Sequence, residues 1–234
     1  MTQWAPKRFW KEVTIASEDD GFRVQLDGKI VKTPAKQNLV LPTQVIAERV
    51  AGEWDAVEDR ITPEDMPWTR SANAAIDKVA VQTVDVIDHL IGYAGTDLLC
   101  YRAESPGSLL DRQLQVWGPI LDWCQSRFDM QFEVTSGVMP VTQPTEGLQK
   151  LRQIMEPMSA FHLTGFHDLV TLSGSYVLAL AVTEKFKDAE SAWEASRLDE
   201  NWQSEQWGVD AEASETAEIK RAAFIHAAKL YQAA

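Results

Sequence analysis

The feature that most constrains the fold is a change of hydrophobic period at Pro42. Before it, Phe22, Val24 and Leu26 alternate with polar residues, which is typical of a strand with one buried face. After it, apolar residues recur at intervals of three and four, the spacing of an amphipathic helix: Ile46, Val50, Trp54 and Val57. The sequence therefore predicts an α+β fold, with a small antiparallel β-rich N-terminal domain and a larger all-α domain.

The β-rich part contains a clear hairpin signal. Asp27-Gly28 follows the alternating segment and suits the positive φ angles of a type I′ turn, and Ile30 begins the return strand. Further short strands are expected at residues 11–15 and 38–41. Since a small sheet leaves its edges unpaired, another element must cover them.

The remainder of the chain reads as helices. Pro63 and Pro67 mark a connector at residues 60–68, so we place the domain boundary there, with a β-rich domain and its bridging helix at 1–60 and a helical domain at 61–234. The segment 162–186 is apolar on nearly all sides, which predicts one central buried helix. Gly118-Pro119 predicts a kink or restart in its helix. The other helices are expected at 43–57, 69–90, 110–128, 145–157, 188–206 and 211–232.

The net charge of the chain argues against two classes of partner, nucleic acids and anionic membranes. The 234 residues carry 35 acidic and 22 basic side chains, a formal net charge of −13. Such a chain lacks the basic surface that nucleic acids and anionic membranes require. The longest apolar run, Val177 to Val182, is far shorter than the roughly 20 residues of a membrane span. We expect neither nucleic-acid binding nor membrane insertion.

Cysteine usage and the N-terminal segment indicate a reducing compartment. Cys100 and Cys124 are the only cysteines and do not form a CxxC motif, so we expect two reduced core thiols. The segment Met1–Lys11 is polar and has no apolar signal region. We expect an intracellular protein.

Motifs for cofactor and nucleotide chemistry are missing. The sequence has neither GxGxxG after a strand nor GxxxxGK[ST], so nucleotide binding through the usual phosphate loops is not expected. There is no HExxH, and His162 and His167 are five apart, which does not place them on one helix face. We therefore predict no cofactor, no metal and no catalytic residues.

Two polar clusters are better explained by structure than by catalysis. Asp85, Asp88 and His89 share one helical turn, where a solvated face accounts for them. Ser173-Gly174-Ser175 lacks the GxSxG frame of a nucleophile elbow and sits in a helical pattern, so tight helix packing is the better account.

The most unusual segment lies near the C-terminus. Residues 188–218 hold ten acidic side chains and one basic residue, Arg197, together with three tryptophans. Two interpretations stay open, a solvated helix face or a surface that recognises a basic, partly apolar protein patch. If it is a binding surface, the candidate partner-binding residues are Arg197, Glu200, Trp202, Glu205, Trp207, Asp210, Glu212 and Glu215.

A series of short motifs resembles, nearly end to end, the assembly chaperones of the F-type ATP synthase that bind its free alpha subunit, the assembly factor 2 type. Each motif is weakly specific by itself, whereas their number and order make the resemblance strong. They are Arg8-Phe9-Trp10-Lys11, the segment 24–29 with Thr33-Pro34, Leu41-Pro42-Thr43, Glu53-Trp54-Asp55, residues 66–70 with 72–73 and 75–77, Thr96 to Arg102, Trp117-Gly118-Pro119, and Ser196 to Glu200 with Trp202-Gln203 and Trp207-Gly208.

The resemblance implies a non-enzymatic, ATP-independent chaperone. Such proteins hold the alpha subunit and mask its interface until it pairs with the beta subunit. They occur in mitochondria and in some bacteria, and the missing presequence favours the bacterial cytoplasm. We expect the chain to be a monomer when free.

Two other functions compete with this interpretation. A small hydrolase-like enzyme could use an acidic site around Thr96–Arg102, with Asp97, Arg102 and Asp77. Such an enzyme needs a deep pocket with converging acids. Alternatively, the protein could be a permanent structural subunit, which would copurify with a mature complex at fixed stoichiometry.

Overall fold

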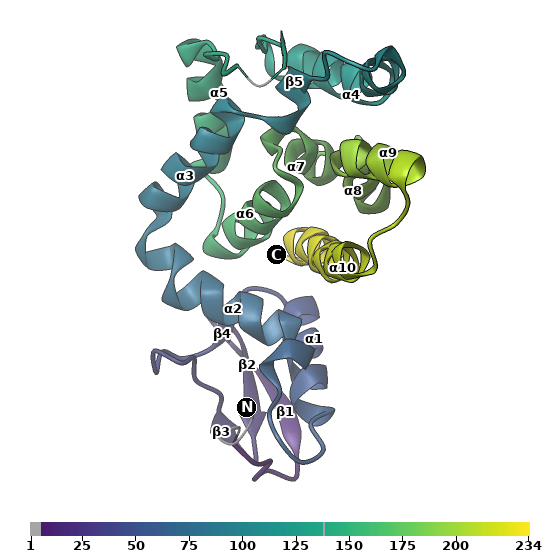
Figure 1. Cartoon of the computed structure of the whole chain (residues 1–234). Helices are drawn as coiled ribbons and strands as arrows, with labels where there is room; N and C mark the ends of the chain where they lie inside the picture. Colours follow the sequence, from purple (N-terminus) through teal and green to yellow (C-terminus); the bar gives the residue numbers. More distant parts are fainter. Residues whose placement is uncertain (1–5, 138) are drawn as a thin grey trace. The chain divides into compact units, whose positions relative to one another are not determined.

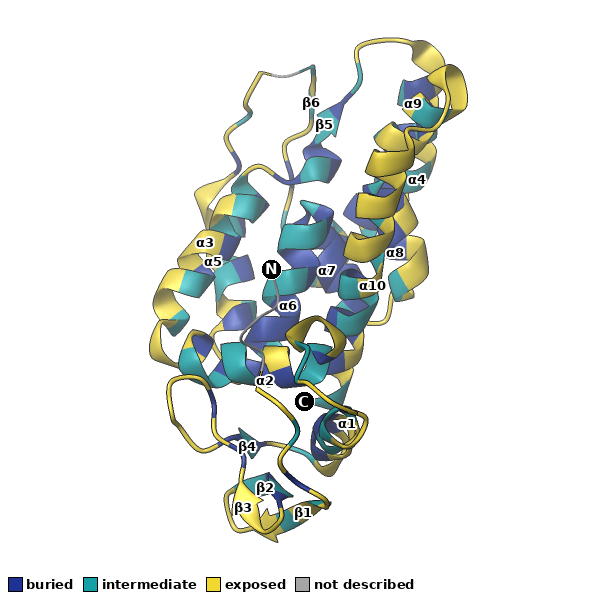
Figure 2. Ribbon diagram, turned by 60° about the horizontal axis from the view of Figure 1, so that its bottom comes forward, coloured by how far each residue is buried: buried dark blue, intermediate teal, exposed yellow. Residues whose placement is uncertain are grey.

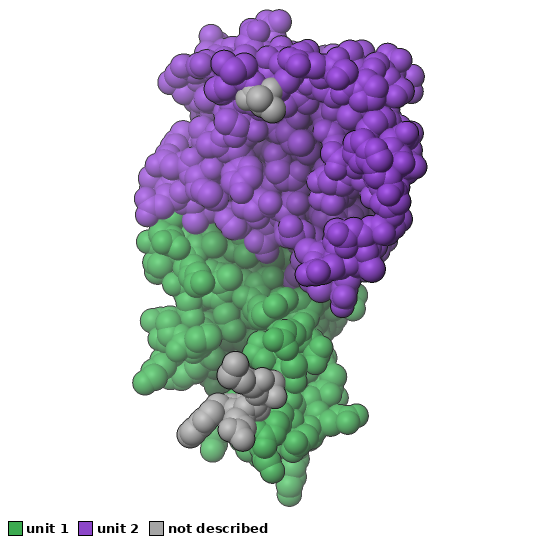
Figure 3. Space-filling model, in the orientation of Figure 1, with its two compact units in different colours: residues 1–83, 159–165, 229–234 green, residues 84–158, 166–228 purple. Residues whose placement is uncertain are grey.

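The structure is a computed structural model, and it describes residues 6–137 and 139–234. The first five residues of the N-terminal segment and residue 138, in the connector before the 145–157 helix, lie outside the described residues. Two compact units make up the chain (Figure 3): unit 1 comprises residues 1–83, 159–165 and 229–234, and unit 2 comprises residues 84–158 and 166–228. The predicted α+β fold class is confirmed, whereas the domain boundary at residue 60 stays a prediction.

The sheet of unit 1 is antiparallel and centred on β2 (Gly21–Leu26). This strand pairs with β1 (Val13–Glu18), β3 (Lys29–Ile30) and β4 (Val40–Leu41) (Figure 1). Leu26 pairs with Lys29, and the two residues between them, Asp27 and Gly28, have φ angles of 48° and 76°. Positive φ at both central positions is what a type I′ turn requires, so the predicted hairpin is confirmed.

The core of unit 1 combines residues from both ends of the chain. The helix α1 (Gln44–Asp55) packs its buried residues Ile46 and Val50 against the sheet. The same core contains Phe161 and Leu230, which come from distant segments. Near the end of α1, the carboxylate of Glu53 accepts hydrogen bonds from the N–H groups of Trp68 and Thr69, in the first turn of α2 (Pro67–Asp77). The core of unit 1 is therefore completed by later parts of the chain.

Unit 2 is built almost entirely from helices (Figure 1). Its small parallel sheet pairs β5 (Tyr101–Arg102) with β6 (Thr135–Ser136).

The other elements of the whole chain are helical. Short 3₁₀ turns lie at Pro63–Asp65, Val79–Val81 and Leu98–Cys100. The remaining α-helices are α3 (Thr83–Gly95), α4 (Gly107–Phe128), α5 (Thr145–Met155), α6 (Ala160–Ser173), α7 (Tyr176–Thr183), α8 (Ala189–Ser196), α9 (Leu198–Trp207) and α10 (Ala211–Ala233).

The helix α7 is the buried centre of unit 2, and Figure 2 shows it in dark blue. Every residue from Tyr176 to Val182 is buried, and α4 and α8 contact this helix. The indole N–H of Trp117 in α4 donates to the carbonyl of Ala195 in α8 over 2.8 Å. These contacts fix α8, and therefore the start of α9, against the core.

The prediction of one helix over 162–186 is wrong. The chain forms α6 and α7 instead, separated by Gly174 with φ +70° and by Ser175, whose hydroxyl accepts a hydrogen bond from the N–H of Leu178. A left-handed glycine ends the first helix and a serine cap starts the second. The central, buried position expected for this segment is confirmed by α7.

Two other predicted helices are interrupted, whereas the restart considered at Pro119 is absent. Residues 69–90 divide into α2 and α3, and residues 188–206 divide into α8 and α9 at Arg197, which has φ −101° and ψ 12°. In contrast, α4 continues through Pro119 from Gly107 to Phe128. The carbonyl that loses its donor belongs to Gln115, an exposed residue, so water can satisfy it.

Candidate partner-binding site

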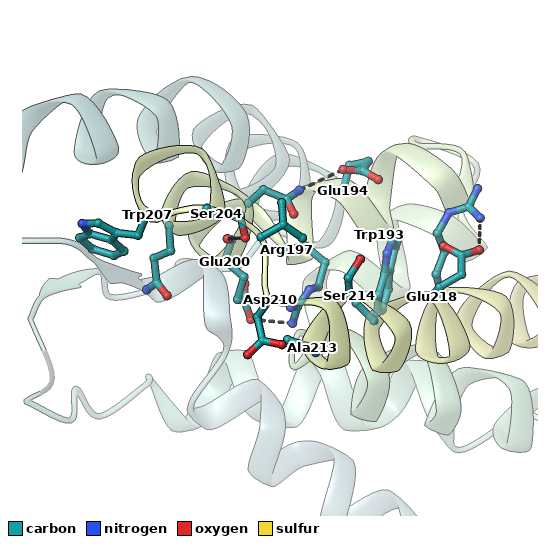
Figure 4. A pocket seen from close by; sticks show the side chains of 16 residues that line it. Trp193, Glu194, Arg197, Glu200, Ser204, Trp207, Asp210, Ala213, Ser214 and Glu218 are labelled. Carbon is teal, nitrogen blue, oxygen red and sulfur yellow. Dashed lines mark hydrogen bonds and ion pairs between the residues drawn. The ribbon is translucent and has the colours of Figure 1, made fainter.

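Residues of the unusual acidic segment line a groove in unit 2 (Figure 4). The helices α8, α9 and α10 form its walls, with the connection 208–210 at one end, and its volume is about 510 Å³. The residues that line it are Trp193, Glu194, Arg197, Glu200, Asn201, Gln203, Ser204, Trp207, Gly208, Val209, Asp210, Ala213, Ser214, Ala217, Glu218 and Arg221. The turn between α9 and α10 is made by Gly208, whose φ is +95°.

Two large apolar side chains of the groove are mostly exposed to solvent and are not part of the packed core. Trp207 is 76% exposed and Val209 is 74% exposed, and both line the groove. Ala213 and Ala217 continue the apolar strip along α10. The ring of Trp207 stands nearly perpendicular to that of the buried Trp202, with ring centres 5.8 Å apart. Large apolar side chains displayed beside polar ones are typical of a protein-binding surface.

Four carboxylates and two guanidinium groups surround these apolar residues. Arg197 donates to Glu200 over 2.6 Å, and its guanidinium lies 6.0 Å from the ring centre of Trp193. Arg221 pairs with Glu218 over 2.9 Å. In the view of Figure 4, Arg197 and Glu200 lie between Trp207 and Trp193. The groove therefore has an acidic balance, and one arginine already occupies an aromatic and acidic setting inside it.

Asp210 lines the end of the groove and also has a structural role there. Its carboxylate accepts hydrogen bonds from the N–H groups of Glu212 and Ala213, at 2.9 and 3.2 Å. It thus caps the N-terminus of α10 and holds the mouth of the groove in shape.

The structure brings together four of the eight residues suggested by the sequence, Arg197, Glu200, Trp207 and Asp210. Glu205 lies outside the groove and accepts two hydrogen bonds from Arg112, at 2.8 and 2.9 Å. Trp202 is only 8% exposed, so it supports the surface from below. Glu212 lines an adjoining hollow, and Glu215 is exposed outside both.

Sequence reasoning proposed Glu212 and Glu215 of α10 but missed the residues of this helix that line the groove. Ala213, Ala217 and Arg221 are spaced four apart, as are Ser214 and Glu218, and this spacing places each set on one helix face. That pattern was visible in the sequence. However, nothing in the sequence says that this face lies opposite α9.

The residues of the competing enzymatic site are engaged in structural roles. Asp97 is fully buried, and its carboxylate accepts from Leu99 N–H, Val177 N–H and the Ser175 hydroxyl, at 2.9, 2.9 and 2.8 Å. Burial raises the pKa of Asp97 to about 6, although these hydrogen bonds oppose the increase. In unit 1, Asp77 accepts from the Thr33 hydroxyl over 2.6 Å. Each carboxylate thus belongs to its own local network.

The histidine and aspartate clusters are likewise held by neighbours. Asp88 pairs with Arg152, and His89 stacks on His167 with ring centres 5.9 Å apart. His162 hydrogen-bonds Ser159. Within residues 6–137 and 139–234 the structure gathers no group of three or more histidine, cysteine, aspartate or glutamate side chains that could hold a metal ion. Over the same ranges, no helix combines the length and apolar character needed to cross a membrane.

Comparisons with known proteins identify relatives over most of the chain. A family model described as ATP12 chaperone protein matches residues 7–125. The protein named atp12, mitochondrial, from Schizosaccharomyces pombe is 23% identical over 221 residues, which cover 89% of this chain and 76% of that protein.

Solved structures are more similar still. The crystal structure of Atp12 from Paracoccus denitrificans is 44% identical, covers 97% of both chains and superposes with a TM-score of 0.93. A protein from Agrobacterium tumefaciens, described as a proposed chaperone, is 38% identical with a TM-score of 0.92, over 97% of this chain and 86% of that chain. The chain therefore belongs to the ATP12 chaperone family, which is the chaperone family that its sequence motifs resemble.

Proposed function

We propose that this protein is an ATP-independent assembly chaperone that binds the unassembled alpha subunit of the F-type ATP synthase. It masks the interface of that subunit until the subunit pairs with beta. Membership of the ATP12 family and the motif resemblance support the class of function. The observation that carries the proposed site is the groove of α8, α9 and α10, where the exposed Trp207 stands among carboxylates.

The chemistry of the groove suits such a client. A free subunit of an alternating ring exposes the surface meant for its neighbour, and an exposed apolar patch of that size promotes aggregation. Trp207 and Val209 offer apolar contact area, and the surrounding carboxylates favour a basic patch. The chaperone needs only to bind the alpha subunit less tightly than the beta subunit does. Beta can then displace the chaperone without ATP.

We further propose that the protein has no catalytic activity, is a monomer when free and works in the bacterial cytoplasm. The absence of phosphate-loop motifs from the sequence supports a mechanism without nucleotide. The structural roles of Asp97 and Asp77 leave the alternative hydrolase without a supporting observation.

Co-expression tests the client directly. Isolated alpha subunit should stay soluble when this protein is present and aggregate when it is absent, whereas isolated beta subunit should not be rescued. Equal aggregation of alpha in both cases would refute the proposal. A permanent structural subunit would instead copurify with the assembled enzyme at fixed stoichiometry, which a chaperone should not do.

Charge neutralisation in the groove tests the site. The double change Glu200→Gln with Glu218→Gln removes two of the four groove carboxylates. Since charge mainly accelerates encounter, association with alpha should slow and its dependence on salt should flatten. The matched control is Glu146→Gln with Glu156→Gln, which neutralises two exposed acids of unit 2 outside the groove. Equal association rates for both double variants would place the client surface elsewhere.

A further inference from the structure

The sheet of unit 1 has one unpaired edge. The strand β1 lies at the end of this sheet and pairs with β2 along its whole length (Figure 1). No other strand among residues 6–137 and 139–234 pairs with β1. By contrast, β2 has β1 on one side and β3 and β4 on the other. The hydrogen-bonding pattern of the sheet is therefore open at the outer edge of β1.

A hydrogen bond at the start of β1 shows which main-chain groups face this edge. The carbonyl of Glu12 accepts from the N–H of Asp27, just beyond the end of β2, over 3.0 Å. Successive residues of a strand direct their main-chain groups to alternate sides, so every second residue after Glu12 also bonds to β2. The outward groups, which point away from β2, are the N–H and C=O groups of Val13, Ile15 and Ser17. No described residue forms a hydrogen bond with an outward group.

The edge of β1 lacks the features that usually prevent strand addition. Native sheets protect such an edge with a charged residue, a proline or a bulge. Residues 13–17 contain no charged residue, proline or glycine. Each residue of β1 is matched with one residue of β2, so no bulge twists the strand away. The edge can therefore accept another strand.

The side chain of Ile15 shows that the core is incompletely covered at this edge. Ile15 lies opposite Val24 and therefore on the face of the sheet that carries the core. Val24 is fully buried, whereas Ile15 is 38% exposed and does not belong to the core of unit 1. A further strand beside β1 would bring a side chain against Ile15 and bury it.

We propose that the free edge of β1 binds an extended segment of the client, which joins the sheet as an antiparallel strand. The identity of this client rests on the proposed function. Hydrogen bonds to the outward groups supply affinity, and contact with Ile15 selects an apolar residue in the segment. The edge belongs to unit 1, so it is distinct from the groove of unit 2.

The charges that follow β1 define the chemistry of the segment further. Glu18 ends the strand, and Asp19 and Asp20 come directly after it. Arg23 pairs with Glu18 and with Asp20, over 2.8 Å in each case, while Asp19 is exposed. Three acids and one arginine leave a negative balance at this end of β1. An antiparallel segment with a basic residue at its N-terminal end matches this balance.

A second copy of this chain fits the edge less well. Both antiparallel registers that overlap most of β1 with β1 of a copy place Glu12 opposite an acidic residue, Glu18 or Asp20. Like charges directly opposite each other destabilise a strand pair, and twofold symmetry repeats the contact. The net charge of −13 on each chain adds to the repulsion. The charges therefore favour a different protein as the occupant.

Residue-resolved hydrogen–deuterium exchange of the full-length protein tests the proposal, with purified free alpha subunit as the probe. In the free protein, the outward N–H groups should exchange at least tenfold faster than the N–H groups of residues 14, 16 and 18, which bond to β2. Saturating alpha subunit should slow the outward N–H groups at least tenfold. Such an alternation along one strand is specific to strand addition, because other contacts do not protect every second amide.

Three results of this experiment would overturn the proposal. If alpha binds and the outward N–H groups exchange as in the free protein, the client binds elsewhere and the proposed function stands. If these groups become protected when the concentration of the protein alone is raised, a second copy occupies the edge. If alpha does not bind the wild type at all, the proposed function fails, and the occupant named here fails with it.

The variant Ser17→Pro removes one outward N–H group. Proline is tolerated on an edge strand where its nitrogen faces away from the sheet, so the melting temperature should change little. Binding of the alpha subunit should weaken at least tenfold. The matched control, Ser17→Ala, keeps the N–H group and should bind alpha within twofold of the wild type. Equal binding by the two variants would contradict strand addition.

A second pair of variants decides the question if Ser17→Pro does not fold. Ile15→Lys places a charge on the core face of the edge, and Thr14→Lys places the same charge on the opposite face, where Thr14 is exposed. Ile15→Lys should weaken binding of alpha at least tenfold, whereas Thr14→Lys should bind within twofold of the wild type. Equal affinities of these two variants would show that the edge is not part of the client surface.

Discussion

The hydroxyl of Thr43 donates a hydrogen bond of 2.7 Å to the main-chain carbonyl of Ala233, joining two residues 190 positions apart. The same oxygen accepts from the N–H of Ile46 and so caps α1. One threonine therefore starts the helix that covers the sheet and ties the C-terminal segment to it.

Replacement of Thr43 tests this double role. Thr43→Val keeps the size but removes the donor and the cap, and should lower the free energy of unfolding by about 1–2 kcal/mol. Thr43→Ser retains the hydroxyl and should lie within about 0.5 kcal/mol of the wild type. Urea denaturation of the three proteins measures both values. If Thr43→Val unfolds at the same urea concentration as the wild type, the C-terminal segment is held by apolar packing alone.

Gly28 tests the hairpin turn. No atom lies within 4 Å of the position that a Cβ would take, so any cost comes from the φ of +76° and not from a clash. Gly28→Val should cost about 1–3 kcal/mol, and Gly28→Asn should cost clearly less, because asparagine tolerates this conformation. Thermal melting of the pair decides the point. Equal losses would show that crowding, not backbone conformation, limits the position.

Asp97 gives a pH dependence with a definite sign. Its pKa of about 6 in the folded protein exceeds the ordinary value of 3.8. Between these values the unfolded chain has released the proton while the folded protein retains it. The free energy of unfolding should therefore fall as pH rises from about 4 to 6, by up to about 3 kcal/mol.

The Asp97→Asn variant isolates that contribution, since asparagine does not titrate. Whatever stability advantage the wild type has over Asp97→Asn should shrink by about 2–3 kcal/mol between pH 4 and 7, as urea titrations at stepped pH would record. Parallel pH profiles for the two proteins would mean that Asp97 is ionised in the folded state throughout.

Two tryptophans of α9 should separate binding from stability. Trp207 is 76% exposed, so Trp207→Ala should change stability by less than about 0.5 kcal/mol yet weaken binding of the alpha subunit about tenfold or more. Trp202 is buried, and Trp202→Ala should cost about 3–5 kcal/mol. Melting and client-binding measurements on both variants provide the comparison. Normal client binding by a folded Trp207→Ala protein would remove Trp207 from the site.

Local signals explain which parts of the fold could be predicted from the sequence. The Asp27-Gly28 turn and the stripe of α1 depend on neighbours a few residues away, and both are found as expected. The start of α7 was missed because its cap is partly supplied from outside: the N–H of Val177 donates to Asp97, 80 residues earlier. No window of sequence around Val177 contains that carboxylate.

The same contrast between local signals and contacts with distant residues applies to the candidate site. The acidic and aromatic composition of residues 188–218 is visible in the sequence, and Arg197, Glu200, Trp207 and Asp210 do line the groove. Which acids are withdrawn from it depends on tertiary pairing, as Arg112 on α4 shows by holding Glu205.

The composition of unit 1 has a consequence for synthesis on the ribosome. The strands and α1 emerge early, but their core includes Phe161 and Leu230, which are translated far later. Part of the apolar core around the nascent sheet therefore stays unburied while most of the chain is made. Until Leu230 is translated, the N-terminal core of this protein is incomplete and part of its apolar surface is exposed, as in a subunit that has not yet met its partner. The final step of folding of unit 1 must therefore follow the synthesis of Leu230.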